Sequence, residues 1–311
     1  MAAMLYKTNI FAIVGCEKNK DYKQNQVLIW DDDGAKILYK INLQENVINL
    51  KLRSDKVFIV CLNKIYILNA KNEYVISGIY DTGLNPNGLL IAINYNEESC
   101  IIVYPSNKSE KNKDINKDIL TIRYLDKNDV KYFSPHEHKV TYIALSYNGQ
   151  LLATASEDGI KIRIFDTETL ESLHEFHRGK DRAEIKYIAI DIENKFVAVS
   201  SSKNTIHIWI LSQSKKSGKY EFNENENNNT ENQISNTSSF FSVLPNILGG
   251  KLFNNEWSFA KVKLNESESD AIFQFISKNS LIIITSSGKC LKAKIDMKNG
   301  GICENIEEFY I

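Results

Sequence analysis

Short apolar runs recur along the chain, separated by polar turns, and none has the length or period of a long helix. The runs fall into sets of four, as at residues 140–145, 151–155, 160–165 and 170–176. The other expected strands are residues 4–7 (a possible first strand), 11–15, 26–30 and 37–41; 47–52, 57–62, 65–68 and 74–80; 89–93, 100–104, 119–124 and 130–133; 185–190, 196–200, 205–210 and 257–262; and 271–276, 281–285, 290–295 and 302–309. Four strands repeating at about 45 residues predict an all-β fold of the β-propeller type, with one four-stranded sheet per blade and six visible blades.

The clearest repeat is the fourth, which spans residues 144–166. Its Asn148-Gly149 and Asp158-Gly159 pairs are residue types that accept positive φ in tight hairpins. The pattern is that of a WD repeat. Because a fold does not define a function, the repeat alone indicates only a scaffold for protein interactions.

Composition and charge limit the kinds of partner that the chain can bind. A chain of 311 residues with 43% apolar content can bury a substantial core, as one all-β domain or two smaller ones. The formal net charge of −1 gives no global attraction to nucleic acid or to anionic membranes, so any anion site must be a local patch. The Lys-rich residues 107–114 are interrupted by acids and are expected to form a solvated hairpin tip, not a nucleic-acid site.

The sequence offers no motif for catalysis, metal or cofactor binding. It lacks a phosphate-binding Gly-rich motif before a helix, metal-ligand spacing and a nucleophile elbow, so we expect no enzymatic activity and no cofactor. There is no pattern of the signal-peptide type and no apolar stretch that approaches a transmembrane span, so we expect a soluble protein whose membrane contact is peripheral. The cysteines are odd in number and scattered, which predicts reduced thiols: Cys16, Cys61, Cys100, Cys290 and Cys303.

A cationic turn between two apolar strands, at residues 173–182, is the most distinctive local feature. It contains His177, Arg178 and Gly179, followed by Lys180 and Arg182. Successive residues of an extended chain alternate faces, so the first two side chains can each serve a separate anion pocket. The alternative is an ordinary solvated loop.

The run from residue 135 through the fourth repeat and this turn to residue 209 resembles the PROPPIN family, in its smaller WIPI-type branch. Residues 25–32, 85–89 and 257–260 extend the resemblance over nearly the whole chain. These are WD-repeat propellers that bind polyphosphoinositides and act in autophagy and endolysosomal membrane traffic. The family normally has seven blades, so the resemblance suggests that the first blade is missing here, or that six blades close the ring.

The resemblance also implies the partners and the location. We expect a monomer in the cytoplasm that is recruited peripherally to autophagosomal precursor, endosomal or vacuolar membranes. Autophagy proteins, such as a large lipid-transfer protein, would be its protein partners. The whole of residues 1–311 would form a single propeller domain.

The resemblance further assigns two headgroup pockets, one on each side of the cationic turn. Phosphates require fixed cations with hydroxyl and imidazole donors, and the planar guanidinium of Arg suits them best. The first pocket would use His136, Ser156, Gly159, Arg163 and His177. The second would use Arg178, Gly179, Ser201, Thr205 and His207, assisted by Lys180 and Arg182.

Each of these residues has a structural alternative. The two serines could satisfy turn groups, while Arg163 and His207 could be routine strand residues. The first pocket also departs from the family, because His177 replaces an Arg and Ile160 replaces a hydroxyl residue. We therefore expect the second pocket to bind more strongly near neutral pH, with acidification narrowing the difference if His177 is a ligand.

Residues 212–255 form a long insertion in the fifth visible blade, and its polar first half is expected to be disordered. The second half carries a short amphipathic stripe: Phe240, Phe241, Leu244, Ile247 and Leu248. By resemblance this segment would insert into the bilayer; alternatively it packs back on the propeller. The sequence thus predicts an effector that binds phosphatidylinositol 3-phosphate, with the 3,5-bisphosphate as a second candidate. The alternative function is a WD-repeat scaffold without lipid binding.

Overall fold

The computed structural model describes the chain except residues 6, 17–20, 87, 89–90, 109–117, 212–236, 239–255, 266–269, 278, 297–302 and 311; at residues 237–238, 256 and 303–310 it describes the backbone alone. Within the described residues every regular element is a β-strand, and none is a helix that could cross a membrane. The chain divides into two compact units, residues 1–134 and 135–311.

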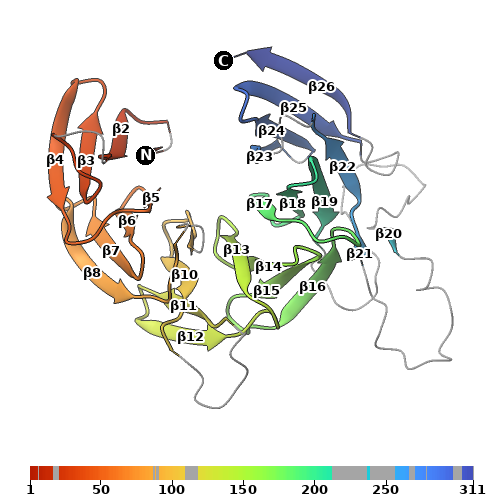
Figure 1. The fold of residues 1–311 in the computed structure, drawn as a ribbon, viewed down its shortest axis with the longest axis horizontal. Helices are drawn as coiled ribbons and strands as arrows, with labels where there is room; N and C mark the ends of the chain where they lie inside the picture. Colours follow the sequence, from red (N-terminus) through yellow and green to blue (C-terminus); the bar gives the residue numbers. More distant parts are fainter. Residues whose placement is uncertain are drawn as a thin grey trace. The chain divides into compact units, whose positions relative to one another are not determined.

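The first unit contains three antiparallel sheets of four strands each, whose order in space follows the order in the chain (Figure 1). This is the meander expected of propeller blades. The strands are β1 (Ala2–Met4), β2 (Ile10–Val14), β3 (Gln26–Asp31) and β4 (Lys36–Asn42); β5 (Asn49–Leu52), β6 (Lys56–Val60), β7 (Lys64–Asn69) and β8 (Val75–Asp81); and β9 (Ala92–Ile93), β10 (Ile101–Pro105), β11 (Leu120–Tyr124) and β12 (Asp129–Phe133).

The second unit contains three further sheets of this kind, and β21 and β20 extend one of them to six strands. The prediction of an all-β propeller fold with six sheets is confirmed. The strands are β13 (Val140–Leu145), β14 (Leu151–Ser156), β15 (Lys161–Asp166) and β16 (Ser172–His177), with β20 (Thr237–Ser238) and β21 (Glu256–Trp257); β17 (Ile185–Ile190), β18 (Phe196–Ser201), β19 (Thr205–Ile210) and β22 (Ala260–Lys263); and β23 (Ile272–Ser277), β24 (Ser280–Ile284), β25 (Lys289–Ile295) and β26 (Cys303–Tyr310).

Two expected strands were misplaced. The possible strand at residues 4–7 is wrong, because β1 ends at Met4 and a turn follows, in which the Thr8 amide donates to the Leu5 carbonyl at 3.1 Å. The expected strand at residues 257–262 is two strands. Trp257 belongs to β21, which pairs in parallel with β16, whereas β22 pairs with β19 and completes the next sheet.

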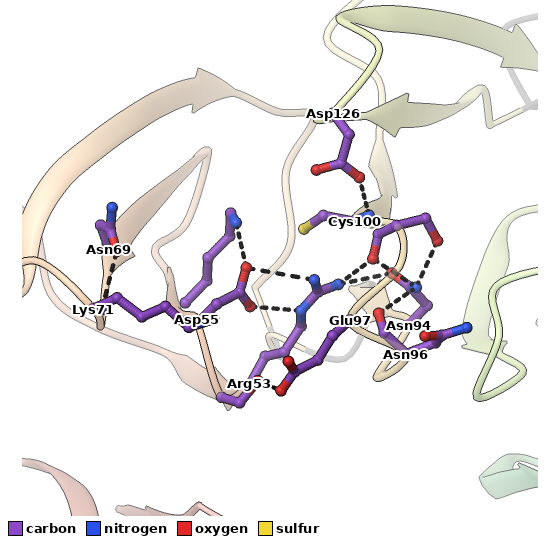
Figure 2. Close-up of polar contacts among 12 residues, drawn as sticks. Arg53, Asp55, Asn69, Lys71, Asn94, Asn96, Glu97, Cys100 and Asp126 are labelled. Atoms are coloured by element: carbon purple, nitrogen blue, oxygen red, sulfur yellow. Dashed lines mark hydrogen bonds and ion pairs between the residues drawn. The ribbon is translucent and has the colours of Figure 1, made fainter.

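A polar network joins two sheets of the first unit through the buried side chain of Arg53 (Figure 2). Its Nε donates to Asp55 Oδ1 at 2.6 Å, and its Nη1 donates to the Ser99 carbonyl at 2.5 Å and to Asn94 Oδ1 at 3.3 Å. Asn94 Oδ1 also accepts from the Ile101 amide at 2.7 Å. A buried cation is stable only when its donors are satisfied, so this network fixes β5 against the sheet that contains β10.

In the second unit a ladder of aromatic rings connects β16 with β19. His174 stacks on Phe176 with ring centroids 5.0 Å apart, Phe176 on Trp209 at 5.3 Å, and Trp209 on His207 at 5.6 Å. Phe176 and Trp209 are fully buried. Each such side chain contributes about 1.5–3 kcal/mol through burial, so the ladder holds β16, the strand that leads into the cationic turn, against β19.

Candidate anion-binding site

The hairpin turn between β14 and β15 forms one wall of the predicted site. Ser156 Oγ donates to Asp158 Oδ1 at 2.7 Å, and the same carboxylate oxygen accepts from the Ile160 amide at 3.2 Å. The hydroxyl of Ser156 therefore stabilises its own turn, as in the structural alternative for this residue.

Gly159 lets the chain that follows the cationic turn approach this hairpin closely. Its φ is +58°, and a Cβ at this position would lie 1.8 Å from the carbonyl oxygen of Ala183. The amide of Ala183 in turn donates to the Asp158 carbonyl at 3.1 Å. The space beside Gly159 is thus filled by the protein's own backbone.

Arg178 lies directly after β16 and is 5% exposed. Its Nε donates to the Gly159 carbonyl at 2.7 Å, and its Nη2 donates to the Asp181 carbonyl. Among the described residues, Nη1 has no acceptor. The guanidinium is thus oriented from one side by two carbonyls and keeps donors on Nη1 for a ligand.

Burial lowers the pKa of Arg178, whereas the negative charges of Asp181 and Asp158 act in the opposite direction. Because a guanidinium loses its proton only far above neutral pH, the side chain stays charged under ordinary conditions. It therefore supplies one fixed positive charge, which two carboxylates partly offset.

The turn between β18 and β19 forms the other wall. Ser201 is buried at the end of β18, and its hydroxyl accepts from the Lys203 amide at 3.4 Å. Thr205 begins β19 and donates from Oγ1 to the Lys203 carbonyl at 3.2 Å. Asn204, at φ +53°, places its buried Oδ1 where no described residue donates to it. The turn thus brings three short polar side chains, those of Ser201, Asn204 and Thr205, to one edge of the sheet.

His207 is buried on β19, two positions after Thr205. Its Nδ1 lies 3.1 Å from Ser258 Oγ. Burial lowers the pKa of His207 to about 3, and the positive charges of Lys261 and Arg178 act in the same direction. The imidazole is therefore neutral at physiological pH and can serve a ligand only as a neutral hydrogen-bonding group.

The structure adds two lysines that the sequence analysis did not assign to the site. Lys261 lies opposite His207 and Lys263 opposite Thr205 in the pairing of β22 with β19. Opposite residues of an antiparallel pair project from the same face. Both lysines are exposed, while Val262 between them is buried. Apolar residues and lysines alternate in residues 260–263, and this pattern indicates a strand with its lysines on one face. The sequence could not show which neighbouring strand this segment pairs with.

On the other side of the turn, His136 and Arg163 are both engaged within the protein. The ring Nε2 of His136 lies 2.9 Å from Thr154 Oγ1. Burial, together with the positive charge of Arg163, lowers the pKa of His136 to about 4. Arg163 itself donates from Nη1 to the Pro135 carbonyl at 2.7 Å and from Nε to Glu175 Oε2 at 2.8 Å.

Glu175 places a negative charge among the residues of the first predicted pocket. Lys161 Nζ lies 2.5 Å from Glu175 Oε1, so two cations share this carboxylate. Burial alone would raise the pKa of Glu175, but the hydrogen bonds and charges of Lys161 and Arg163 outweigh it and lower the pKa. A ligand anion would have to compete with this carboxylate for Arg163.

His177 ends β16 beside the same carboxylate. Its Nε2 is 3.9 Å from Glu175 Oε1, and its ring centroid is 6.0 Å from that of Trp257. The contact with Trp257 follows from the pairing of β21 with β16. Trp257, two residues after the long insertion, is therefore held next to the cationic turn.

The structure thus gathers the predicted residues into two groups on either side of residues 177–183. Arg178, Ser201, Thr205 and His207 gather on one side, with Lys180 and Arg182 exposed nearby and open space around Gly179. The predicted membrane segment lies outside the described residues: Phe240, Phe241, Leu244, Ile247 and Leu248. Among the described residues, no group of His, Cys, Asp and Glu side chains could hold a metal ion.

The PROPPIN family model matches residues 4–310. The chain belongs to the PROPPIN family. It is 31% identical to autophagy-related protein 18e of Arabidopsis thaliana over 311 residues, which cover 100% of this chain and 76% of that protein. It is also 27% identical to SVP1-like protein 2 of Debaryomyces hansenii, over 92% of this chain and 74% of that protein.

Solved structures agree on the fold. Kluyveromyces lactis Hsv2 superposes with a TM-score of 0.72 at 19% identity and covers 100% of this chain and 86% of its own. A complex of KlAtg21 with the coiled-coil of AgAtg16 gives a TM-score of 0.77 at 17% identity, with coverage of 100% and 84%. The family resemblance that the sequence showed is confirmed, and the relatives include autophagy-related proteins.

Proposed function

We propose that this chain binds phosphoinositides at the Arg178 side of the cationic turn and acts as an effector in autophagy and endolysosomal membrane traffic. The monophosphate ligand is phosphatidylinositol 3-phosphate, and the 3,5-bisphosphate is a second ligand. The observation that supports this proposal most is Arg178 itself, because two carbonyls orient its guanidinium while Nη1 keeps its donors.

The first predicted pocket, on the Arg163 side of the turn, contributes less to lipid binding in this proposal. Arg163 is paired with Glu175, and His136 and Ser156 are bonded within the protein. The internal carboxylate of Glu175, which pairs with Arg163, is a further reason to expect that the Arg178 pocket binds more strongly near neutral pH.

Membrane residence in this proposal also needs the insertion, residues 212–255. Trp257, two residues after the insertion, lies beside His177, so an inserting segment would be attached close to the cationic turn. Two modest contacts on one body can give useful avidity. Burial of Phe240 and Phe241 in the membrane interface would contribute about 1.5–3 kcal/mol each before ordering costs.

The proposal that this chain has protein partners is based on its relatives. Since one relative of known structure is bound to a coiled-coil of AgAtg16, we propose that this chain also binds autophagy proteins, with a lipid-transfer protein as the expected partner. It would be cytoplasmic and recruited peripherally to autophagosomal precursor, endosomal or vacuolar membranes.

The test is co-sedimentation with phosphatidylcholine vesicles, with and without phosphatidylinositol 3-phosphate. Wild type should sediment only with the phosphoinositide, and Arg178→Ala should bind about 10- to 100-fold more weakly, because it loses one charge-assisted contact. Lys71→Ala, which removes one exposed charge in the first unit, is the matched control and should bind like wild type. Thermal unfolding checks that each variant folds, since Arg178 also bonds two carbonyls.

A variant with Phe240→Ser and Phe241→Ser should keep its melting temperature but lose most membrane residence. Unchanged sedimentation would remove the insertion from the proposal. If wild type itself fails to sediment with the phosphoinositide, the proposal of lipid binding is wrong, and the alternative, a WD-repeat scaffold that binds proteins only, takes its place.

A further inference from the structure

The inner sheets of the chain are packed on both faces, and successive residues of one strand serve the two sides in turn. In β18, Phe196 and Ala198 belong to one buried cluster, whereas Val197 and Val199 belong to another. In the same way, β6 and β7 contribute to one cluster with the sheet of β1–β4 and to a second cluster with the sheet of β9–β12. On each side of these sheets the covering layer is another sheet of the chain.

The sheet of β23–β26 uses only one of its faces in this way. Phe273 and Leu281 lie in the cluster that this sheet shares with the sheet of β17, β18, β19 and β22. The alternate residues point to the other face, on which Ile272 lies opposite Ile284 in the paired strands. Ile272 is 54% exposed, Ile276 on the same strand is 49% exposed, and Ile284 is 37% exposed. This face is therefore apolar and exposed.

The sheet of β1–β4 also has one exposed apolar face. Its Ala12 and Ile29 are buried in the cluster shared with the sheet of β5–β8. On the other face a single apolar row crosses all four strands, because each member lies opposite the next in the paired strands: Met4, Phe11, Trp30 and Ile37. Met4 is 51% and Ile37 is 39% exposed, and the two aromatic residues between them are partly exposed.

The two exposed faces are of opposite kinds. Wherever two consecutive sheets share a cluster, the forward side of the earlier sheet meets the backward side of the later one. The sheet of β23–β26 is the later sheet of its cluster, so its forward side is exposed. The sheet of β1–β4 is the earlier sheet of its cluster, so its backward side is exposed. A second copy of the chain thus offers each exposed face a partner of the kind that the fold already uses.

The size of such a contact predicts weak association. Strands of five to seven residues, at about 3.3 Å per residue and about 4.8 Å between strands, give each face about 400 Å². One contact would bury about 800 Å² from the two copies together, whereas stable complexes bury about 1,200–2,000 Å². The contact should therefore form in concentrated solution and dissociate on dilution.

We propose that the exposed face of the β23–β26 sheet packs against the exposed face of the β1–β4 sheet of a second copy, so that the chain associates head to tail. After a first contact each copy keeps one exposed face, so association closes into a dimer or continues into longer assemblies. The chain is then not the monomer that the family resemblance implied. The contact does not depend on the proposed lipid binding.

The test is sedimentation velocity of the lipid-free protein at increasing concentrations. Wild type should sediment as a single chain when dilute and as a dimer or larger assembly when concentrated. Ile272→Lys with Ile276→Lys should weaken the association at least about tenfold, because the contact would then bury two unpaired charges. The matched control is Val75→Lys with Ile79→Lys on β8, where the side chains are 55% and 53% exposed, and it should associate like wild type. Since all four positions are exposed, each variant should keep its melting temperature.

A second variant tests the head-to-tail arrangement. Met4→Lys with Ile37→Lys changes the other face and should also weaken association at least about tenfold. In a mixture of this variant with Ile272→Lys, Ile276→Lys, each partner keeps one intact face of a different kind. The mixture should therefore form a dimer at concentrations where either variant alone sediments as a single chain.

Sedimentation of wild type as a single chain at every concentration would overturn the proposal. An equal loss of association in the β8 control would overturn it too, because the added charge would then act without regard to the face. If wild type associates but the mixture does not, copies meet through like faces and the head-to-tail contact is wrong. Failure of vesicle binding would count against the proposed function and not against this contact, because sedimentation is measured without lipid.

Discussion

Acidification should destabilise the second unit through His207, whose proton affinity differs between the folded and unfolded states. The folded imidazole is buried and lies near the charges of Lys261 and Arg178, which lowers its pKa to about 3 from the ordinary value of 6.5. Below pH 6.5 the unfolded chain therefore binds a proton that the folded chain does not. The stabilisation from the neutral imidazole is complete above pH 6.5 and is lost as the pH falls toward 3.

The size of the effect follows from this difference. Each pH unit in the window costs about 1.4 kcal/mol per group. Between pH 7 and pH 5 only the part below 6.5 counts, which gives a loss of about 2 kcal/mol for His207. Other groups, among them His136 with a folded pKa of about 4, add to the dependence on pH in the same window.

A His207→Gln variant separates His207 from those groups, because glutamine can still bond Ser258 but does not titrate. Urea unfolding of both proteins at pH 7 and pH 5 should show that wild type loses about 2 kcal/mol more than the variant on acidification. Other titrating groups affect both proteins alike and cancel in the comparison. Parallel losses, equal within about 0.5 kcal/mol, would refute the claim that His207 is held neutral.

Two further substitutions test the framework of the sheets. Gly159→Ala should cost more than about 2 kcal/mol of unfolding free energy, because the left-handed backbone alone costs about 1–2 kcal/mol and the new Cβ would meet the Ala183 carbonyl. Gly179→Ala, with no atom within 4 Å of its Cβ, is the control. Equal melting temperatures for the two variants would contradict the contact. Arg53→Met should cost about 1.5–3 kcal/mol, because it removes the charged donor that links Asp55 to Asn94 and the Ser99 carbonyl (Figure 2). Asp55 keeps Lys56, and the Ser99 carbonyl keeps Asn94, as partners. No loss in this variant would show that the network does not join the sheets.

Much of the fold could be predicted because its signals are local. β-Strands alternate their side chains with a period of two, and the Asn148-Gly149 and Asp158-Gly159 pairs mark tight turns wherever they occur. The repeat of four such strands therefore indicated the sheets and their order. The strand that was divided wrongly, at residues 257–262, is one whose partners lie far away in the chain. That residues 1–311 form one domain stays a prediction.

The candidate site likewise has features that local sequence shows and features that only the folded structure shows. The sequence alone showed the cationic turn and the resemblance to the family, since both are readable from local runs of residues. The resemblance in turn assigned the residues of the two pockets, which stay a prediction. Only the tertiary structure determined the contacts of those residues. Glu175 forms an ion pair with Arg163, the Ala183 backbone lies close against Gly159, and Lys261 lies opposite His207 in the paired strands. Charge, burial and hydrogen bonding depend on neighbours that strand pairing brings from far along the chain, as it brings Trp257 to His177, and a linear pattern does not contain that pairing.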